Sequence, residues 1–298
     1  MLAIIGTIPD VAFPLLKDRV FLENDMIRIE DRSAAVNRGT PALIAATVKT
    51  SEFLGQSLPF VYLAGDIGTG EGSRRIYESL VREVGGSGFT TIAFHYLQPD
   101  VDWHNRIIFA INDMEKRPLL IADAGFMYSA KISGQAGAYD LFTPDIGELA
   151  FLADEKAPHP FYTRGFILHE ENSASELISR AYANENAARY LLVKGKEDFI
   201  ADQNGILAAV KIHKKEAMEA IGGTGDTLTG IAAALIESKM EIRDAAITAA
   251  KVNRLAGYKT RPTPATQVTE IINHIPHALS EVLQNKKQKN SSCSGSKL

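Results

Sequence analysis

The sequence predicts one α/β domain, a three-layer α/β/α sandwich with a mostly parallel central sheet. Short apolar runs bounded by Gly, Pro, Asp or Lys recur along the chain, a pattern typical of buried strands. Segments with the apolar spacing of amphipathic helices alternate with these runs. Near-continuous apolar strands alternating with such helices indicate a parallel sheet with helices on both faces.

The expected strands are apolar or β-branched runs at residues 2–5, 60–64, 90–96, 119–122 and 190–193. Ile76, Leu80 and Val84 lie four residues apart and share one face of a predicted helix. Further helical patterns cover residues 41–55, 103–116, 173–184, 225–237, 242–256 and 268–283.

Length and composition favour one domain. A chain of 298 residues fits a single extended sheet, and no repeat or flexible linker divides it. We therefore expect one catalytic domain over residues 1–283. Residues 284–298 are mostly Lys, Gln, Asn, Ser and Gly without periodicity, so we expect them to form a disordered polar tail.

The composition excludes several classes of partner. A net charge of −4 and a pI near 6.0 give no basis for binding nucleic acid, which requires clustered Lys and Arg. Cys293 is the one cysteine, so we expect neither an intrachain disulfide nor a cysteine metal site. We expect no membrane partner, because no apolar run approaches the ~18 residues of a membrane span. A homo-oligomer is compatible with the sequence.

The location that we expect is the cytoplasm. The chain ends in Ser296, Lys297 and Leu298, which match the peroxisomal import signal. That match would indicate a peroxisomal location only in a eukaryote.

The most informative stretch is a glycine-rich turn before a predicted helix, with the sequence Gly222-Gly223-Thr224-Gly225-Asp226. Glycines leave room for an anion, and the first N–H groups of a helix have no partner within it. The helix dipole adds partial positive charge there. We therefore expect Gly222, Gly223, Thr224 and Gly225 to bind nucleotide phosphates.

Asp226 is the candidate general base. Beside a bound phosphate, its carboxylate can take a proton from an attacking hydroxyl group. The alternative is that Asp226 only caps the helix. The number of surrounding glycines favours the catalytic interpretation.

This turn resembles the Gly-x-Gly-Asp motif of the ribokinase-like superfamily, and most closely that of the NAD(P)H-hydrate dehydratases related to the YjeF carboxy-terminal domain. Asp123-Ala124-Gly125, the Thr143-Pro144 element with Glu148, and Lys194-Gly195 follow in the family's order. The resemblance covers about residues 119–257 and implies a ribokinase-like fold. It also implies ATP (or ADP) and Mg²⁺ as cofactors.

Three parts of the sequence depart from this family, and one is residues 38–48, where its amino-terminal Gly-Ala-Gly signature is not evident. Residues 216–221 replace its Asn-Pro-Gly-Met-Ala-Thr segment, and Asn253-Arg254 replaces its His-Gly. From the resemblance, Asn253 is expected near the nucleotide base. The departures put the substrate in doubt and leave the nucleotide chemistry in place.

A second glycine-rich turn follows the strand at residues 60–64 and contains Asp66, Gly68 and Gly70. It lacks the Lys of a Walker loop and the spacing of the dinucleotide fingerprint. We expect these residues to contact substrate, although a packed turn without a ligand is equally compatible. Asp123, at the end of another strand, is a further substrate-binding candidate, with a turn aspartate as the alternative.

Glu148 and Lys194 are the candidates for a metal and a phosphate contact. Glu148 lies one helical turn beyond Pro144, where it could hold Mg²⁺ through water. Lys194, at a strand end, could neutralise phosphate charge, and a solvated lysine is the alternative. His95 and His104 match no common metal motif, so we leave them out of the catalytic set.

The function expected first is a carbohydrate-type kinase that transfers a phosphoryl group to a hydroxylated small molecule. The first alternative is an ATP- or ADP-dependent NAD(P)H-hydrate dehydratase, as the family resemblance implies. The second is a non-catalytic nucleotide-binding protein.

Overall fold

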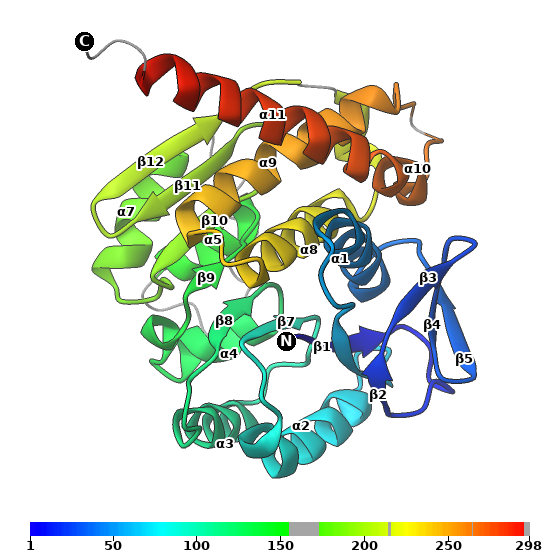
Figure 1. The fold of residues 1–298 in the computed structure, drawn as a ribbon. Helices are drawn as coiled ribbons and strands as arrows, with labels where there is room; N and C mark the ends of the chain where they lie inside the picture. Colours follow the sequence, from blue (N-terminus) through cyan, green and yellow to red (C-terminus); the bar gives the residue numbers. More distant parts are fainter. Residues whose placement is uncertain (155–172, 214–215, 264, 295–298) are drawn as a thin grey trace.

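The computed structural model describes residues 1–154, 173–213, 216–263 and 265–294. A nine-stranded sheet in the order β12-β11-β10-β9-β8-β7-β1-β6-β2 runs through the molecule (Figure 1). Its strands are β1 (Leu2–Ile8), β2 (Leu16–Arg19), β6 (Phe60–Gly65), β7 (Thr91–His95), β8 (Leu119–Ala122), β9 (Leu141–Phe142), β10 (Tyr190–Val193), β11 (Asp198–Asp202) and β12 (Gly205–Val210).

The centre of the sheet is parallel. β1 pairs in parallel with both β6 and β7, and the pairs β7–β8, β8–β9 and β9–β10 are parallel too. β2 pairs antiparallel with β6 at one end, and β11 with β10 and β12 at the other. The carboxyl ends of the parallel strands therefore meet along one edge.

Helices cover both faces (Figure 1). One face carries α1 (Thr40–Leu54), α8 (Thr224–Glu237), α9 (Ile242–Lys259), α10 (Val268–Asn273) and α11 (Ile275–Ser294). The other carries α2 (Glu71–Glu83), α3 (Val101–Asn112), α4 (Phe126–Ile132), α5 (Ile146–Ala153) and α7 (Ala174–Ala183). Ile4 and Ile5 of β1 belong to the two different cores, because successive side chains of a strand point to opposite faces.

The predicted three-layer sandwich and its strands are thus confirmed. The sequence did not predict a small antiparallel sheet of β3 (Phe21–Glu23), β4 (Met26–Ile29) and β5 (Arg32–Ala35). Asn24 and Asp25 join β3 to β4 with φ angles of 50° and 60°, as a tight hairpin turn requires. Strands this short give only a weak sequence signal. Short 3₁₀ helices lie at η1 (Val84–Gly86), η2 (Ala136–Ala138) and η4 (Glu216–Ala220).

One expectation for the last helices needs correction. The predicted helix over residues 268–283 is two helices that separate at His274, because Pro276 lacks the N–H that a continuous helix would need. α11 is described as far as Ser294, and the disorder expected from residue 284 onward stays a prediction. Lys286 Nζ, 2.8 Å from Asp244 Oδ2 of α9, ties that segment to the domain. Residues 296–298, which match the peroxisomal import signal, lie outside the described residues.

None of the helices that the structure describes is long and apolar enough to cross a membrane.

Candidate active site

The amino terminus of α8 forms the glycine-rich turn predicted from the sequence. Gly223 precedes the helix with a φ of 97°, a left-handed value that favours glycine, and no side chain caps the helix. Thr224, Gly225 and Asp226 form the first turn, where N–H groups have no partner within a helix. The turn is thus built to receive an anion.

Gly230, in the same motif, has a different role. A Cβ built on it would lie 2.2 Å from the carbonyl oxygen of Leu43, so it allows α1 and α8 to pack closely.

Asp226 is held at the first turn of α8 by groups from two distant segments. Its Oδ2 accepts a hydrogen bond of 2.6 Å from the N–H of Gly39, and its Oδ1 lies 3.1 Å from Nε2 of His95. Asp226 is only 7% exposed. Burial pushes its pKa up, but the hydrogen bond from His95, the charge of Lys194 and the Gly39 N–H outweigh burial, so the pKa lies below its usual range. The carboxylate is therefore ionised at neutral pH.

His95, which the sequence analysis left out, is central to this arrangement. Its Nδ1 lies 3.0 Å from Oγ1 of Thr40, and its ring is fully buried. A ring that carries its proton on Nε2 donates to Asp226 and accepts from the Thr40 hydroxyl, which satisfies both nitrogens. The sequence feature that could have identified His95 as a site residue is its place at the end of β7, since the ends of parallel strands meet at one edge of the sheet.

Asp123 lies beside this group, at the end of β8. Each of its oxygens is 2.9 Å from Nζ of Lys194, and Oδ2 accepts a 2.7 Å bond from Oγ1 of Thr229. The hydroxyl of Thr143 lies 3.0 Å from that of Thr229. Asp123 is 1% exposed. Its carboxylate therefore fixes Lys194 and α8, and the contact with substrate expected for Asp123 stays a prediction.

Lys194 brings a positive charge to the glycine-rich turn. A Cβ built on Gly225 would lie 3.3 Å from its Cδ and 3.7 Å from its Nζ. Burial lowers the pKa of Lys194. The negative charges of Asp123 and Glu148 raise it by more than burial lowers it, so the pKa of Lys194 lies above its usual value. A stable ammonium group beside free backbone amides fits a phosphate.

Asn253 lies beside the first turn of α8, and its expected contact with a nucleotide base stays a prediction. Its Nδ2 donates to the carbonyl of Thr224 at 3.0 Å, and its Oδ1 accepts from Oγ1 of Thr227 at 2.7 Å. It is 6% exposed. Both ends of its amide therefore hold the first turn of α8 in place.

Arg254 anchors a neighbouring turn. Its Nε lies 2.5 Å from Oδ2 of Asp198, and its Nη2 donates to the carbonyl of Gly195 at 2.8 Å. The arginine that replaces a glycine of the family motif thus fixes the loop after Lys194.

Glu148 begins α5 as the second half of a capping box. Its Oε2 accepts from the N–H of Asp145 at 2.8 Å, and its Oε1 accepts from the hydroxyl of Tyr128 at 2.9 Å. Burial is the main reason that its pKa rises to about 7; the charge of Asp123 adds to this, and that of Lys194 opposes it. One lone pair on each oxygen remains available, which suits an indirect contact with a cation through water.

Asp66 organises the second glycine-rich turn. Its carboxylate accepts from the N–H groups of Gly68, Gly70 and Ser73 and from the Ser73 hydroxyl, at 2.9–3.1 Å. Burial raises the pKa of Asp66, but these four bonds outweigh it and hold the pKa below the usual range. The Asp66 carboxylate thus shapes its own loop, and its expected contact with substrate stays a prediction.

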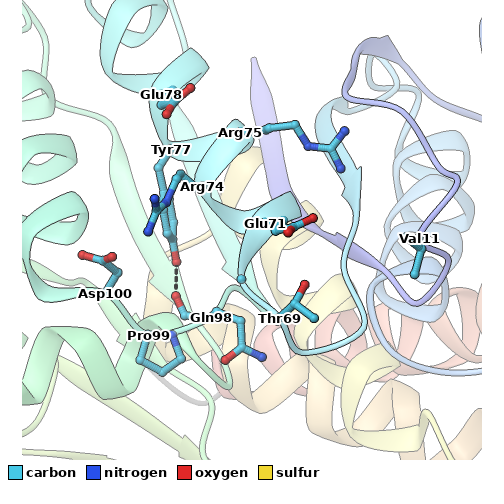
Figure 2. Close-up of a pocket in the computed structure, with 11 residues that line it drawn as sticks. Val11, Thr69, Glu71, Arg74, Arg75, Tyr77, Glu78, Gln98, Pro99 and Asp100 are labelled. Carbon is cyan, nitrogen blue, oxygen red and sulfur yellow. Dashed lines mark hydrogen bonds between the residues drawn. The ribbon is translucent and has the colours of Figure 1, made fainter.

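A pocket of about 830 Å³ opens between this turn and the start of α3 (Figure 2). The hydroxyl of Tyr77 donates to the carbonyl of Gln98, and Arg74 and Asp100 lie on the same side of the view (Figure 2). Its lining residues are Val11, Thr69, Gly70, Glu71, Arg74, Arg75, Tyr77, Glu78, Gln98, Pro99 and Asp100. His104 lies elsewhere, buried between Tyr139 and Ser133.

His95, Asp123 and Asp226 bring one ligand atom each within 4.8 Å of one another, a spacing compatible with a metal ion. The donor set does not suit Mg²⁺ bound directly, because Mg²⁺ prefers oxygen ligands and the Lys194 ammonium already contacts both oxygens of Asp123. Glu148, through water, suits Mg²⁺ better.

Comparison with known proteins gives a consistent result. The model of a family described as NAD(P)H-hydrate dehydratase matches residues 99–277. An uncharacterised protein of Methanocaldococcus jannaschii is 41% identical over 243 residues, which cover 81% of this chain and 100% of that protein. The ADP-dependent (S)-NAD(P)H-hydrate dehydratase of Cenarchaeum symbiosum is 31% identical over 163 residues, covering 55% of this chain and 51% of that protein.

A solved structure supports the fold along nearly the whole chain. The ADP/ATP-dependent NAD(P)H-hydrate dehydratase of Bacillus subtilis, co-crystallised with ATP and Mg²⁺, has a TM-score of 0.54 at 13% identity and covers 95% of this chain and 89% of its own. The ribokinase-like fold expected from the sequence is confirmed. Gly39, Thr40 and His95, which surround Asp226, lie before the segment that the family model matches.

Proposed function

Because the chain belongs to the NAD(P)H-hydrate dehydratase family and is an enzyme, we propose that it restores NADH or NADPH from their hydrated forms with ADP or ATP. Of the functions expected from the sequence, this was the first alternative. The carbohydrate-type kinase expected first receives less support, because the family model and the named relative are both dehydratases.

The observation that carries the proposal is the position of Asp226 at the free amino terminus of α8, with Lys194 against Gly225. The carboxylate and the anion-binding turn lie side by side, as phosphoryl transfer to a hydroxyl group requires. Asp226 is also fixed by Gly39 and His95, so it needs little reorganisation to act.

In the proposed reaction, Asp226 takes the proton of the hydroxyl group that hydration added to the nicotinamide ring. The freed oxygen attacks the terminal phosphorus of the nucleotide, and the bond to the leaving phosphate oxygen breaks. The new phosphate ester then leaves with the electrons of its C–O bond, while a proton leaves the neighbouring carbon. A carbon–carbon double bond returns, and the products are NAD(P)H, inorganic phosphate and the shortened nucleotide.

The low pKa of Asp226 suits this role. An ionised carboxylate is ready to accept a proton at neutral pH, and in phosphoryl transfer positioning and electrostatics contribute most of the rate. Gly222, Gly223, Thr224 and Gly225 would bind the phosphates through backbone N–H groups. Lys194 would balance part of the phosphate charge.

A bound Mg²⁺ would neutralise phosphate charge that Lys194 alone leaves uncompensated. Glu148 would hold it through water, because its carboxylate keeps a free lone pair on each oxygen. Asp123 would act by holding Lys194 and Thr229, and Asn253 by holding the first turn of α8.

Recovery of NADH absorbance from its hydrate, with Mg²⁺ and either ADP or ATP, tests the proposal. The wild-type protein should restore absorbance and release one phosphate per NADH formed. Asp226→Asn keeps the shape but removes the basic oxygen, so it should bind nucleotide and lose at least ~100-fold in kcat. Asp113→Asn, an exposed change on the far end of α3, is the matched control.

The other outcomes of this assay distinguish among the three candidate functions. No recovery with either nucleotide refutes the dehydratase. Transfer of phosphate to a sugar or other hydroxylated molecule without elimination would instead support the kinase. Binding of nucleotide without turnover of any hydroxylated substrate would support the non-catalytic alternative.

A further inference from the structure

Tyr96 follows β7 directly and has an unusual backbone. Its φ of 49° lies in the left-handed region, which is rare for a bulky residue. Neighbours impose it: the hydroxyl of Thr7 donates to the Tyr96 carbonyl at 2.6 Å, and the Tyr96 N–H donates to the carbonyl of Ala124 at 3.0 Å. A conformation of this kind persists only where the surroundings fix it, and such residues gather at functional sites.

The side chain of Tyr96 lies against the groups that hold Asp226. Its ring centroid is 4.2 Å from that of His95, and a Cβ built on Gly39 would lie 3.1 Å from its Cε2. His95 and Gly39 are the two partners of the Asp226 carboxylate. Yet Tyr96 is 47% exposed. One side of the ring therefore covers the contacts of Asp226, and the rest of it is open to a ligand.

Other exposed apolar side chains lie at the same edge of the sheet. Val11 follows β1, Ile67 follows β6 and Ile146 begins α5 shortly after β9, with exposures of 64%, 61% and 39%. The carboxyl ends of these parallel strands meet where Tyr96 lies. Exposed apolar groups along this edge are compatible with a site that buries part of a small molecule.

We infer that Tyr96 binds substrate by stacking its ring on the flat, conjugated part of the hydrated nicotinamide ring, and so holds the hydroxyl group of that ring beside Asp226. This inference rests on the proposed function. Stacking fits the observations because it needs an exposed, rigid aromatic face close to the reacting carboxylate. The strained backbone aims that face: an ordinary β conformation would direct the side chain elsewhere.

Steady-state kinetics with NADH hydrate and ADP as the varied substrates test the inference. Tyr96→Gly removes the ring and suits the positive φ, so it should fold at least as well as the wild type. We expect the KM for NADH hydrate to rise about 5- to 100-fold, the effect of one stacked ring, with the KM for ADP unchanged. Tyr96→Phe keeps the ring and should stay within about twofold of the wild type.

Two controls separate stacking from other causes. Tyr96→Ala also lacks the ring but keeps the backbone strain, so it should match Tyr96→Gly in KM and have the lower Tm. Phe109→Ala removes an aromatic ring that is 61% exposed on α3 and should change neither KM. An unchanged KM for NADH hydrate in Tyr96→Gly, or an equal rise for ADP, would overturn the inference.

Failure of the proposed function can be distinguished from failure of the stacking inference. If the wild-type protein restores no NADH, the same variants are titrated with NADH itself, followed by the fluorescence of its dihydronicotinamide ring. Binding that is weakened in Tyr96→Gly and kept in Tyr96→Phe would support a ring-binding role without dehydratase activity. Equal binding in all three proteins, or none in the wild type, would exclude that role.

Discussion

Nε2 of His95 lies 3.1 Å from Oδ1 of Asp226, while Nδ1 of the same ring lies 3.0 Å from the hydroxyl of Thr40. The imidazole thus joins the start of α1 to the start of α8. Since His95 is fully buried, no water competes for either bond. His95 is a positioning residue, because it orients the carboxylate that we propose as the base.

Replacing His95 should lower the rate and change its pH dependence. In His95→Ala, Asp226 loses a fixed orientation, and we expect kcat to fall about 100-fold. Asp226 also loses the strongest influence that lowers its pKa against the effect of burial. Its carboxylate should then be protonated at higher pH, so the acid limb of kcat/KM moves to higher pH.

His95→Gln is the matched control, because its amide keeps an N–H donor at a similar reach. It should recover part of the rate and of the original pH profile. A His95→Ala variant with reduced kcat but an unchanged acid limb would show that Asp226 is not the titrating base.

Asn253→Ala should weaken nucleotide binding. The change removes two hydrogen bonds that hold Thr224 and Thr227 in the first turn of α8, each worth about 1 kcal/mol. We expect the KM for ADP or ATP to rise about tenfold, with a smaller effect on the KM for NADH hydrate. Asn273→Ala, an exposed change in α10, is the control. A selective rise in the KM for NADH hydrate would contradict this role for Asn253.

Asp66→Asn should destabilise the second glycine-rich turn. The amide cannot accept all four hydrogen bonds that the carboxylate accepts, because its NH₂ group would face N–H or O–H donors. We expect the free energy of unfolding to fall by about 1–3 kcal/mol at neutral pH. Because the folded pKa of Asp66 is lowered, its stabilisation is present above the ordinary value of about 3.9 and disappears as the pH falls through the folded pKa.

Urea unfolding at neutral pH and at about pH 3 measures this effect. The gap between Asp66→Asn and the wild type should narrow in acid. A gap that stays constant with pH would mean that the ionised carboxylate contributes nothing beyond its shape.

Gly230→Ala should destabilise the packing of α1 against α8. The added methyl group would lie 2.2 Å from the carbonyl oxygen of Leu43 and 3.0 Å from Oγ1 of Thr47, so the helices must separate. Overpacking of this kind costs about 1–3 kcal/mol or more. Gly85→Ala, where the methyl group meets no atom within 4 Å, should change the stability by less than about 0.5 kcal/mol. Thermal unfolding of both variants checks the prediction, and equal Tm values would contradict it.

The sequence by itself determined the architecture and indicated the proposed centre of the chemistry. Apolar periodicity located β6, β7, β8 and β10, because a buried parallel strand needs a continuous apolar run. The glycines before α8 indicated the proposed anion-binding turn, because few other residues permit that backbone. These signals are local, so a single sequence contains them.

Only the tertiary structure decided which side chains meet Asp226. Gly39 is 187 residues away and His95 is 131 residues away, and nothing local pairs them with it. The structure also separated residues whose polar groups are already bonded, such as Asp66, Asp123 and Asn253, from Tyr96, whose ring remains exposed. Whether a polar group is free for a ligand depends on its partners in space, and the order of residues along the chain does not specify them.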